Sequence, residues 1–137
     1  MAQTFAGVPL ATLVEKALGA RGHSYSPYSK FRVGSALVTK DGTVYTGCNV
    51  ENASYGGAIC AERTSMVKAV SEGHRDFVAI AVATDLTETF GTPCGICRQF
   101  MSEFGTDLVV ILVKPSGDVQ QHTLKQLLPL AFGPSDL

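Results

Sequence analysis

Apolar residues near the start of the chain recur at helical spacing, at Leu10, Leu13, Val14, Ala17 and Leu18. This pattern predicts an amphipathic helix, and Gly19 offers a natural place for it to end. Two runs rich in β-branched and apolar residues follow a polar loop, at 31–39 and 43–48. The Lys-Asp-Gly sequence at 40–42 between them is typical of a hairpin turn, so the two runs are predicted to pair.

The second half of the chain alternates helical patterns with apolar runs. Helices are predicted from Cys60 to about Glu72 and from about Cys94 to Phe104. The runs 77–84 and 108–113 are almost entirely apolar, as in strands that are covered on both faces. Strand, helix, strand, helix and strand in this order predict an α/β fold with parallel crossovers.

The end of the chain predicts one further strand. The link at 115–118 is too short to hold a crossover, so a strand at 119–122 is expected to pair antiparallel with its predecessor. Thr123 is placed to cap a short final helix. The expected architecture is therefore a mixed five-stranded sheet with helices on both faces.

Composition places this fold in one domain. The chain has 137 residues, of which 45% are hydrophobic, enough for one buried core spanning 1–137. Its 11 Lys and Arg against 12 Asp and Glu create no broad positive field, so a nucleic-acid partner is not expected. The sequence has neither a basic, apolar leader nor a run of about 18 apolar residues, which predicts a cytoplasmic protein without a membrane partner.

Four cysteines in a reducing compartment suggest metal binding, reactive thiols or core packing more than disulfides. Cys60 is followed by Glu62 at the start of one predicted helix, and Pro93 precedes Cys94 and Cys97 at the start of the next. Three thiolates would leave the fourth tetrahedral position of zinc open to water, as in catalytic sites. Zinc makes such a water a nucleophile at neutral pH, and Glu62 is placed to move its protons.

The charge of such a centre needs compensation. Three thiolates on Zn²⁺ carry a formal charge of −1, and a fourth anionic ligand would add to it. Two predicted helix N-termini favour anionic sulfur, and Arg63 and Arg98 lie next to the ligand segments. We therefore expect Arg63 to be the main compensating residue and Arg98 to be a second donor to the sulfurs.

Four segments of the chain, in order, resemble the motifs of the small, homotetrameric, zinc-dependent cytidine deaminases, namely 26–34, 47–56, 60–63 and 93–99. The resemblance implies the three-layer cytidine-deaminase-like fold and one Zn²⁺ per subunit. It further implies hydrolytic deamination of free cytidine and 2'-deoxycytidine to uridine and 2'-deoxyuridine with release of ammonia, a reaction of pyrimidine salvage. In this resemblance Cys60, Cys94 and Cys97 bind zinc and Glu62 is catalytic.

The resemblance also implies roles in substrate binding. Phe31 would pack against the pyrimidine ring, while Asn49 and Glu51 would hold the ribose hydroxyls. An aromatic face suits a base, and an amide with a carboxylate suits a diol. Ala61 would offer backbone groups to the edge of the base.

Two more residues are implied to act across subunit boundaries. Tyr55 and the tail residue Phe132 would complete the pockets of a homotetramer. The chain departs from the family pattern at Ser35, where a small apolar residue is usual, and in the loop 85–92. These departures leave the preference among nucleosides open.

Other functions fit parts of the pattern. Cys48 could complete a structural four-cysteine zinc site, although a cysteine in a strand is more often a buried apolar residue. Cys94 and Cys97 alone could form a thiol oxidoreductase motif, which leaves Cys60 and Glu62 unexplained. Within the deaminases, an enzyme acting on a cytosine-bearing antibiotic such as blasticidin S is the nearest alternative.

Overall fold

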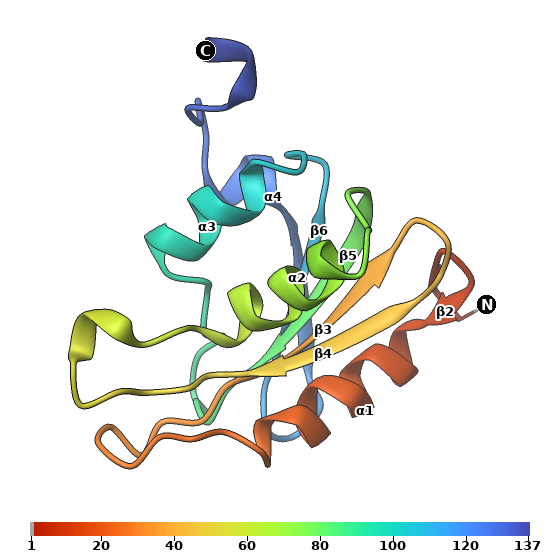
Figure 1. The fold of residues 1–137 in the computed structure, drawn as a ribbon. Coiled ribbons are helices and arrows are strands. Elements are labelled where there is room, and N and C mark those ends of the chain that lie inside the picture. Colours follow the sequence, from red (N-terminus) through yellow and green to blue (C-terminus); the bar gives the residue numbers. More distant parts are fainter. Residues whose placement is uncertain (1) are drawn as a thin grey trace.

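The computed structural model describes residues 2–137, which form a five-stranded sheet with helices against both faces (Figure 1). The strands of the sheet are β3 (Gly34–Thr39), β4 (Val44–Cys48), β5 (Phe77–Ala83), β6 (Val109–Val113) and β7 (Val119–Thr123). The helices are α1 (Leu10–Arg21), α2 (Ala61–Ser71), α3 (Gly95–Ser102) and α4 (Leu124–Leu127). A two-stranded ribbon of β1 (Thr4–Phe5) and β2 (Val8–Pro9) precedes α1, and short 3₁₀ turns occur at Tyr55–Gly57 and Pro134–Asp136.

The strand order is β4-β3-β5-β6-β7, and the sheet is mixed as predicted. β3 is antiparallel to both β4 and β5, β5 is parallel to β6, and β7 is antiparallel to β6. β4 and β5 therefore point the same way without being neighbours, because β3 lies between them. α2 follows the end of β4 and α3 follows the end of β5, so both helices begin at the same edge of the sheet.

Alternate residues of the central strands divide the core into two layers. One layer joins the sheet to α2, α3 and α4 and includes Leu37, Ile80, Val82, Val110, Met66 and Met101. The other joins it to α1 and includes Ala36, Val38, Ala81, Ile111, Leu13 and Ala17. The predicted helices on both faces are thus confirmed, and the capping box of Thr123 on α4 is present as well.

Two predicted boundaries were wrong. α1 does not stop at Gly19 but continues to Arg21, because Ala20 is buried on the sheet and tertiary packing outweighs the low helix propensity of glycine. The strand expected from residue 31 begins only at Gly34. The backbone groups of Phe31 and Val33 bond instead to the side chain of Asn49.

Gly34 permits the close approach of α1 to the sheet. A Cβ at this position would lie 2.2 Å from both Ala17 O and Arg21 N. We expect Gly34→Ala to lower the free energy of unfolding by about 3 kcal/mol, measured by urea denaturation. Gly19→Ala is the control on the facing helix α1, since a Cβ at this position would meet nothing within 4 Å. It should raise stability by up to about 1 kcal/mol, and equal effects of the two substitutions would contradict this account.

Among residues 2–137, no helix combines the length and the apolar character that crossing a membrane requires.

Candidate active site

The starts of α2 and α3 bring three cysteines together. Cys60 is the N-cap of α2, Cys94 is the N-cap of α3, and Cys97 lies in the first turn of α3. Their Sγ atoms all lie within 4.8 Å of one another, and the Cys60 and Cys94 sulfurs are 3.8 Å apart. Sulfurs on a tetrahedral zinc are separated by about 3.8 Å, given Zn–S bonds of about 2.3 Å. The donor set therefore fits Zn²⁺.

Cys48 does not belong to this cluster. Its Sγ donates to His23 O at 3.4 Å in a separate hollow, and it is absent from the group of potential ligands found among residues 2–137. All four cysteines are free thiols. The structure thus brings together three sulfurs and leaves the fourth aside, which argues against a closed four-cysteine site.

Arg63 provides positive charge next to the sulfurs. Its Nη2 donates to Cys60 Sγ at 3.5 Å, and its Nε is buried without a hydrogen-bond partner in residues 2–137. The hydrogen bond from Cys97, followed by the one from Arg63, lowers the pKa of Cys60 to about 5. The contact with Cys60 in turn raises the pKa of Arg63. With the two helix N-termini, this pairing favours anionic sulfur.

Arg98 does not contact the sulfurs, contrary to the prediction. Its guanidinium donates to Pro93 O at 2.7 Å, Leu127 O at 2.6 Å and Thr92 Oγ1 at 3.0 Å. Two carbonyls and a hydroxyl thus engage all three nitrogens of the guanidinium and hold it in this orientation. Arg98 therefore fastens the segment before Cys94 to the end of α4.

We expect Arg63→Ala to weaken zinc affinity by about tenfold to a hundredfold, as measured by competition with a chromogenic chelator. The substitution removes the guanidinium that donates to Cys60 Sγ, so the anionic centre loses compensating charge. Arg75→Ala is the control, because Arg75 is exposed and its hydrogen bonds within residues 2–137 go to Val70 O and His74 O. Unchanged zinc affinity and turnover in Arg63→Ala would show that the helix N-termini suffice.

Glu62 lies beside the sulfurs at the bottom of a cavity of about 510 Å³. Its side chain is 4% exposed, and this burial raises the pKa of the carboxyl group to about 7. The walls come from the loop around Phe31, from the segment after β4 and from the loop after β5, and they include Asn49, Glu51, Leu86, Phe90, Thr92 and Cys94. The cavity is thus a single space shared by two carboxyl groups, two of the thiols and two aromatic rings.

Asn49 and Glu51 also hold the loop that carries Phe31. Asn49 Oδ1 accepts from Val33 N at 2.9 Å, and Asn49 Nδ2 donates to Phe31 O at 2.9 Å. Glu51 accepts from the backbone amides of Tyr28 and Ser29 at 3.0 and 3.1 Å and from the Ser29 hydroxyl. The Ser29 hydroxyl is the main cause that lowers the pKa of Glu51.

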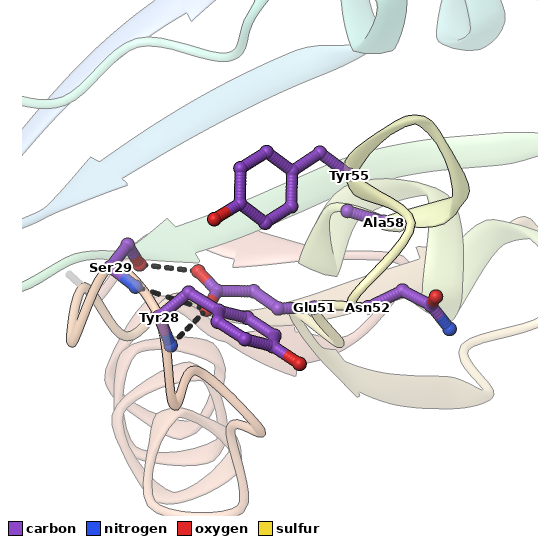
Figure 2. Close-up of a pocket in the computed structure, with 6 residues that line it drawn as sticks. All are labelled: Tyr28, Ser29, Glu51, Asn52, Tyr55 and Ala58. Atoms are coloured by element: carbon purple, nitrogen blue, oxygen red, sulfur yellow. Dashed lines mark hydrogen bonds between the residues drawn. The ribbon is translucent and has the colours of Figure 1, made fainter.

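A second hollow of about 340 Å³ lies on the other side of Glu51 (Figure 2). The rings of Tyr28 and Tyr55 face each other there with centroids 5.7 Å apart, and Tyr55 is 76% exposed. Phe132 lies on the tail beyond α4, where its carbonyl accepts from Gln99 Nε2 at 2.8 Å. Neither Tyr55 nor Phe132 lines the cavity of Glu62 within this chain.

Two small residues position the start of α2, a role that the sequence motifs did not indicate. Ser35 is fully buried and its hydroxyl donates to Ala61 O at 2.7 Å, with Ser65 Oγ at 2.9 Å. Gly47 leaves room for the helix, because a Cβ added at this position would lie 2.7 Å from Ala61 O and 2.6 Å from Ser65 N. A lone serine in an apolar strand was the available signal, since a buried hydroxyl requires a partner.

Comparison with known proteins agrees with this site. The family model for the cytidine and deoxycytidylate deaminase zinc-binding region matches residues 9–113. A cytidine deaminase of Halalkalibacterium halodurans is 52% identical over 126 residues, covering 91% of this chain and 95% of that protein. A probable cytidine deaminase of Dictyostelium discoideum is 48% identical over 128 residues, covering 93% of this chain and 86% of the relative.

Solved structures agree as well. The crystal structure of cytidine deaminase from Burkholderia pseudomallei superimposes with a TM-score of 0.88 at 49% identity, covering 91% of this chain and all of that one (100%). That from Mycobacterium tuberculosis gives a TM-score of 0.76 at 39% identity, with 88% and 94% covered. The chain therefore belongs to the family of zinc-dependent cytidine and deoxycytidylate deaminases.

Proposed function

We propose that this chain catalyses the hydrolytic deamination of free cytidine and 2'-deoxycytidine to uridine and 2'-deoxyuridine plus ammonia. One observation carries the proposal. A buried carboxyl group, Glu62, shares a single cavity with the cysteine cluster and with the ring of Phe31. The relatives named above are cytidine deaminases, which supports the same substrate class for this chain.

Cys60, Cys94 and Cys97 would hold the zinc, which supplies the Lewis acidity that makes water nucleophilic at neutral pH. Glu62 would take a proton from the attacking water and deliver it to the ring nitrogen of the base. The same carboxyl group would then take the remaining proton of the added hydroxyl group and pass it to the amino group, so that the C–N bond breaks, the carbonyl forms and ammonia leaves. Its burial keeps bulk water from competing for these proton transfers.

The remaining walls suit a nucleoside. The face of Phe31 would stack on the pyrimidine, and the buried backbone of Ala61 would meet the edge of the base. Asn49 and Glu51 line the cavity with Phe31. Asn49 Oδ1 is occupied by Val33 N and the Ser24 hydroxyl, but Asn49 Nδ2 keeps one N–H for a ribose oxygen beyond its bond to Phe31 O. The Glu51 carboxylate keeps acceptor capacity for a ribose hydroxyl beyond its bonds to Tyr28 and Ser29. A carboxylate at this place and a net charge of −1 disfavour phosphorylated or polymeric substrates.

We further propose that the chain forms one domain and assembles as a homotetramer in the cytoplasm, where the reaction serves pyrimidine salvage. Tyr55 and Phe132 are 76% and 58% exposed, and Leu130 on the same tail is fully exposed. Large apolar side chains of this exposure are typical of surfaces that other subunits cover. Tyr55 and Phe132 would then complete the cavity of a neighbouring subunit. Sedimentation velocity of the purified protein tests the tetramer.

The substrate assignment is tested by following ammonia release from cytidine, 2'-deoxycytidine, cytosine, adenosine and blasticidin S. The expected result is release from the two cytidine nucleosides, abolished in Glu62→Ala. Release from blasticidin S alone would assign the chain to the antibiotic deaminases. Release from adenosine but from neither cytidine nucleoside would overturn the proposal.

A further inference from the structure

Asp85 joins two walls of the cavity. It directly precedes the loop segment 86–92, which contributes Leu86, Phe90 and Thr92 to the lining. Arg32, the residue after Phe31, reaches across to it from the opposite wall. Asp85 Oδ2 accepts from Arg32 N at 2.9 Å and from Arg32 Nε at 3.2 Å, while Oδ1 accepts from Arg32 Nη2 at 3.0 Å.

A second cation, Arg21, contacts the same carboxylate. Arg21, the last residue of α1, lies 3.3 Å from Asp85 Oδ1 through its Nη1, which also donates to Thr84 O at 2.9 Å. Partial burial opposes ionisation of Asp85, but the contacts with Arg32 and then Arg21 hold its pKa below the usual range. Asp85 thus remains a carboxylate between two guanidinium groups near neutral pH.

The two walls differ in how firmly they are held. The Phe31 wall is fixed by the bonds from Asn49 and Glu51. In the segment 86–91, the bonds among residues 2–137 are local, from Leu86 N to Thr84 Oγ1 and from Thr87 Oγ1 to Glu88. Further along, the Phe90 ring packs against the core with the Lys114 ammonium 4.5 Å from its centroid, and Thr92 accepts from Arg98. Asp85 is therefore the contact that ties the start of the loop to the opposite wall.

We propose that the Arg32–Asp85 pair positions the segment 86–92 against the Phe31 wall and thereby sets how tightly the cavity binds its nucleoside. The two residues are positioning residues, since neither lines the cavity. This inference rests on the proposed function for the identity of the ligand. It assigns a role in affinity to the 85–92 loop, which departs from the family pattern.

The test compares Asp85→Asn and Arg32→Met with the wild-type enzyme. We expect KM for cytidine to rise about three- to tenfold in both, with kcat within twofold and zinc content unchanged. The Kd of uridine, measured by calorimetry, should rise by the same factor. Arg32→Met tests the same contact independently, because it leaves the ion pair between Arg21 and Asp85 in place, whereas Asp85→Asn removes it.

Two further readouts separate positioning from general stability. The increase in KM in the double variant should be smaller than the product of the two single increases, because both changes remove the side-chain bonds between Arg32 and Asp85. Cytidine is uncharged, so salt should change KM by screening the Arg32–Asp85 ion pair rather than by weakening attraction of the substrate. The difference in KM between wild type and variants should therefore be smaller in 1 M NaCl. Asp107→Asn is the control, because this exposed aspartate precedes β6 at the opposite edge of the sheet and should leave KM unchanged.

The outcomes are distinct. A wild-type enzyme that deaminates cytidine while both variants keep its KM and uridine affinity would overturn the inference and leave the proposed function intact. Additive effects, or parallel losses of kcat, zinc and melting temperature, would assign the pair to general stability and overturn it as well. A wild-type protein that binds no nucleoside would overturn both.

Discussion

Glu62→Gln is expected to retain one zinc per chain while kcat for cytidine falls about 10³- to 10⁴-fold. Glutamine has nearly the same shape as the buried glutamate, so packing around the cysteine cluster should persist. It cannot accept and return a proton, and the proposed mechanism asks this one group to serve successive transfers. Zinc is measured by atomic absorption, and turnover by the loss of cytidine absorbance.

Glu15→Gln makes the matching control. Glu15 is exposed on α1, so the same chemical change there should leave kcat and zinc content unaltered. Near-normal turnover in Glu62→Gln would refute the proton-transfer role. Loss of zinc from the same variant would instead indicate that the carboxylate helps to hold the metal.

Cys94→Ala is expected to abolish activity by removing a zinc ligand. Cys94 is exposed at the start of α3, so its truncation opens no cavity in the core and the effect reports on the metal. We expect zinc affinity to fall by at least about a hundredfold, since losing even an outer partner of a ligand costs tenfold to a hundredfold. Dialysis of the wild-type enzyme against a chelator should likewise abolish its activity, and added Zn²⁺ should restore that activity.

Cys48→Ala is the natural comparison, because this thiol lies outside the cluster and donates to the carbonyl of His23. It should keep one zinc per chain and full turnover. If Cys48→Ala released the metal as Cys94→Ala does, the site would be a closed four-cysteine centre and the assignment as an open catalytic site would fail.

The arrangement of the ligand segments was predictable in part. Apolar periodicity marked β5 and β6 as buried strands and placed Cys60 and Cys94 at helix starts, where the structure has them as N-caps. Periodicity reports burial along one segment and does not say which strands are neighbours. The position of β3 between β4 and β5, and the packing of α2 against both β3 and β4, therefore do not follow from these patterns.

The contacts around the site depend on tertiary packing more than the ligand segments do. Arg98 was expected at the sulfurs, yet it donates to Pro93 O and Leu127 O, because the carbonyls at the end of α4 come within its reach only in the folded chain. In the sequence, Ser35 was notable only as a departure from the family pattern. In the structure, its hydroxyl donates to Ala61 O and holds the first turn of α2. Both contacts join segments that no local pattern connects.

The sequence by itself determined the chemistry of this protein: three thiols, a carboxyl group and the local signals that begin two helices at those thiols. Such information is local, because ligand type and helix capping depend on residues a few positions apart. Only the tertiary structure decided that the sulfurs meet, that Cys48 stays apart and that Asp85 ties together two walls of the cavity. Those features depend on strand order and on distances between remote segments, which packing of the whole core sets.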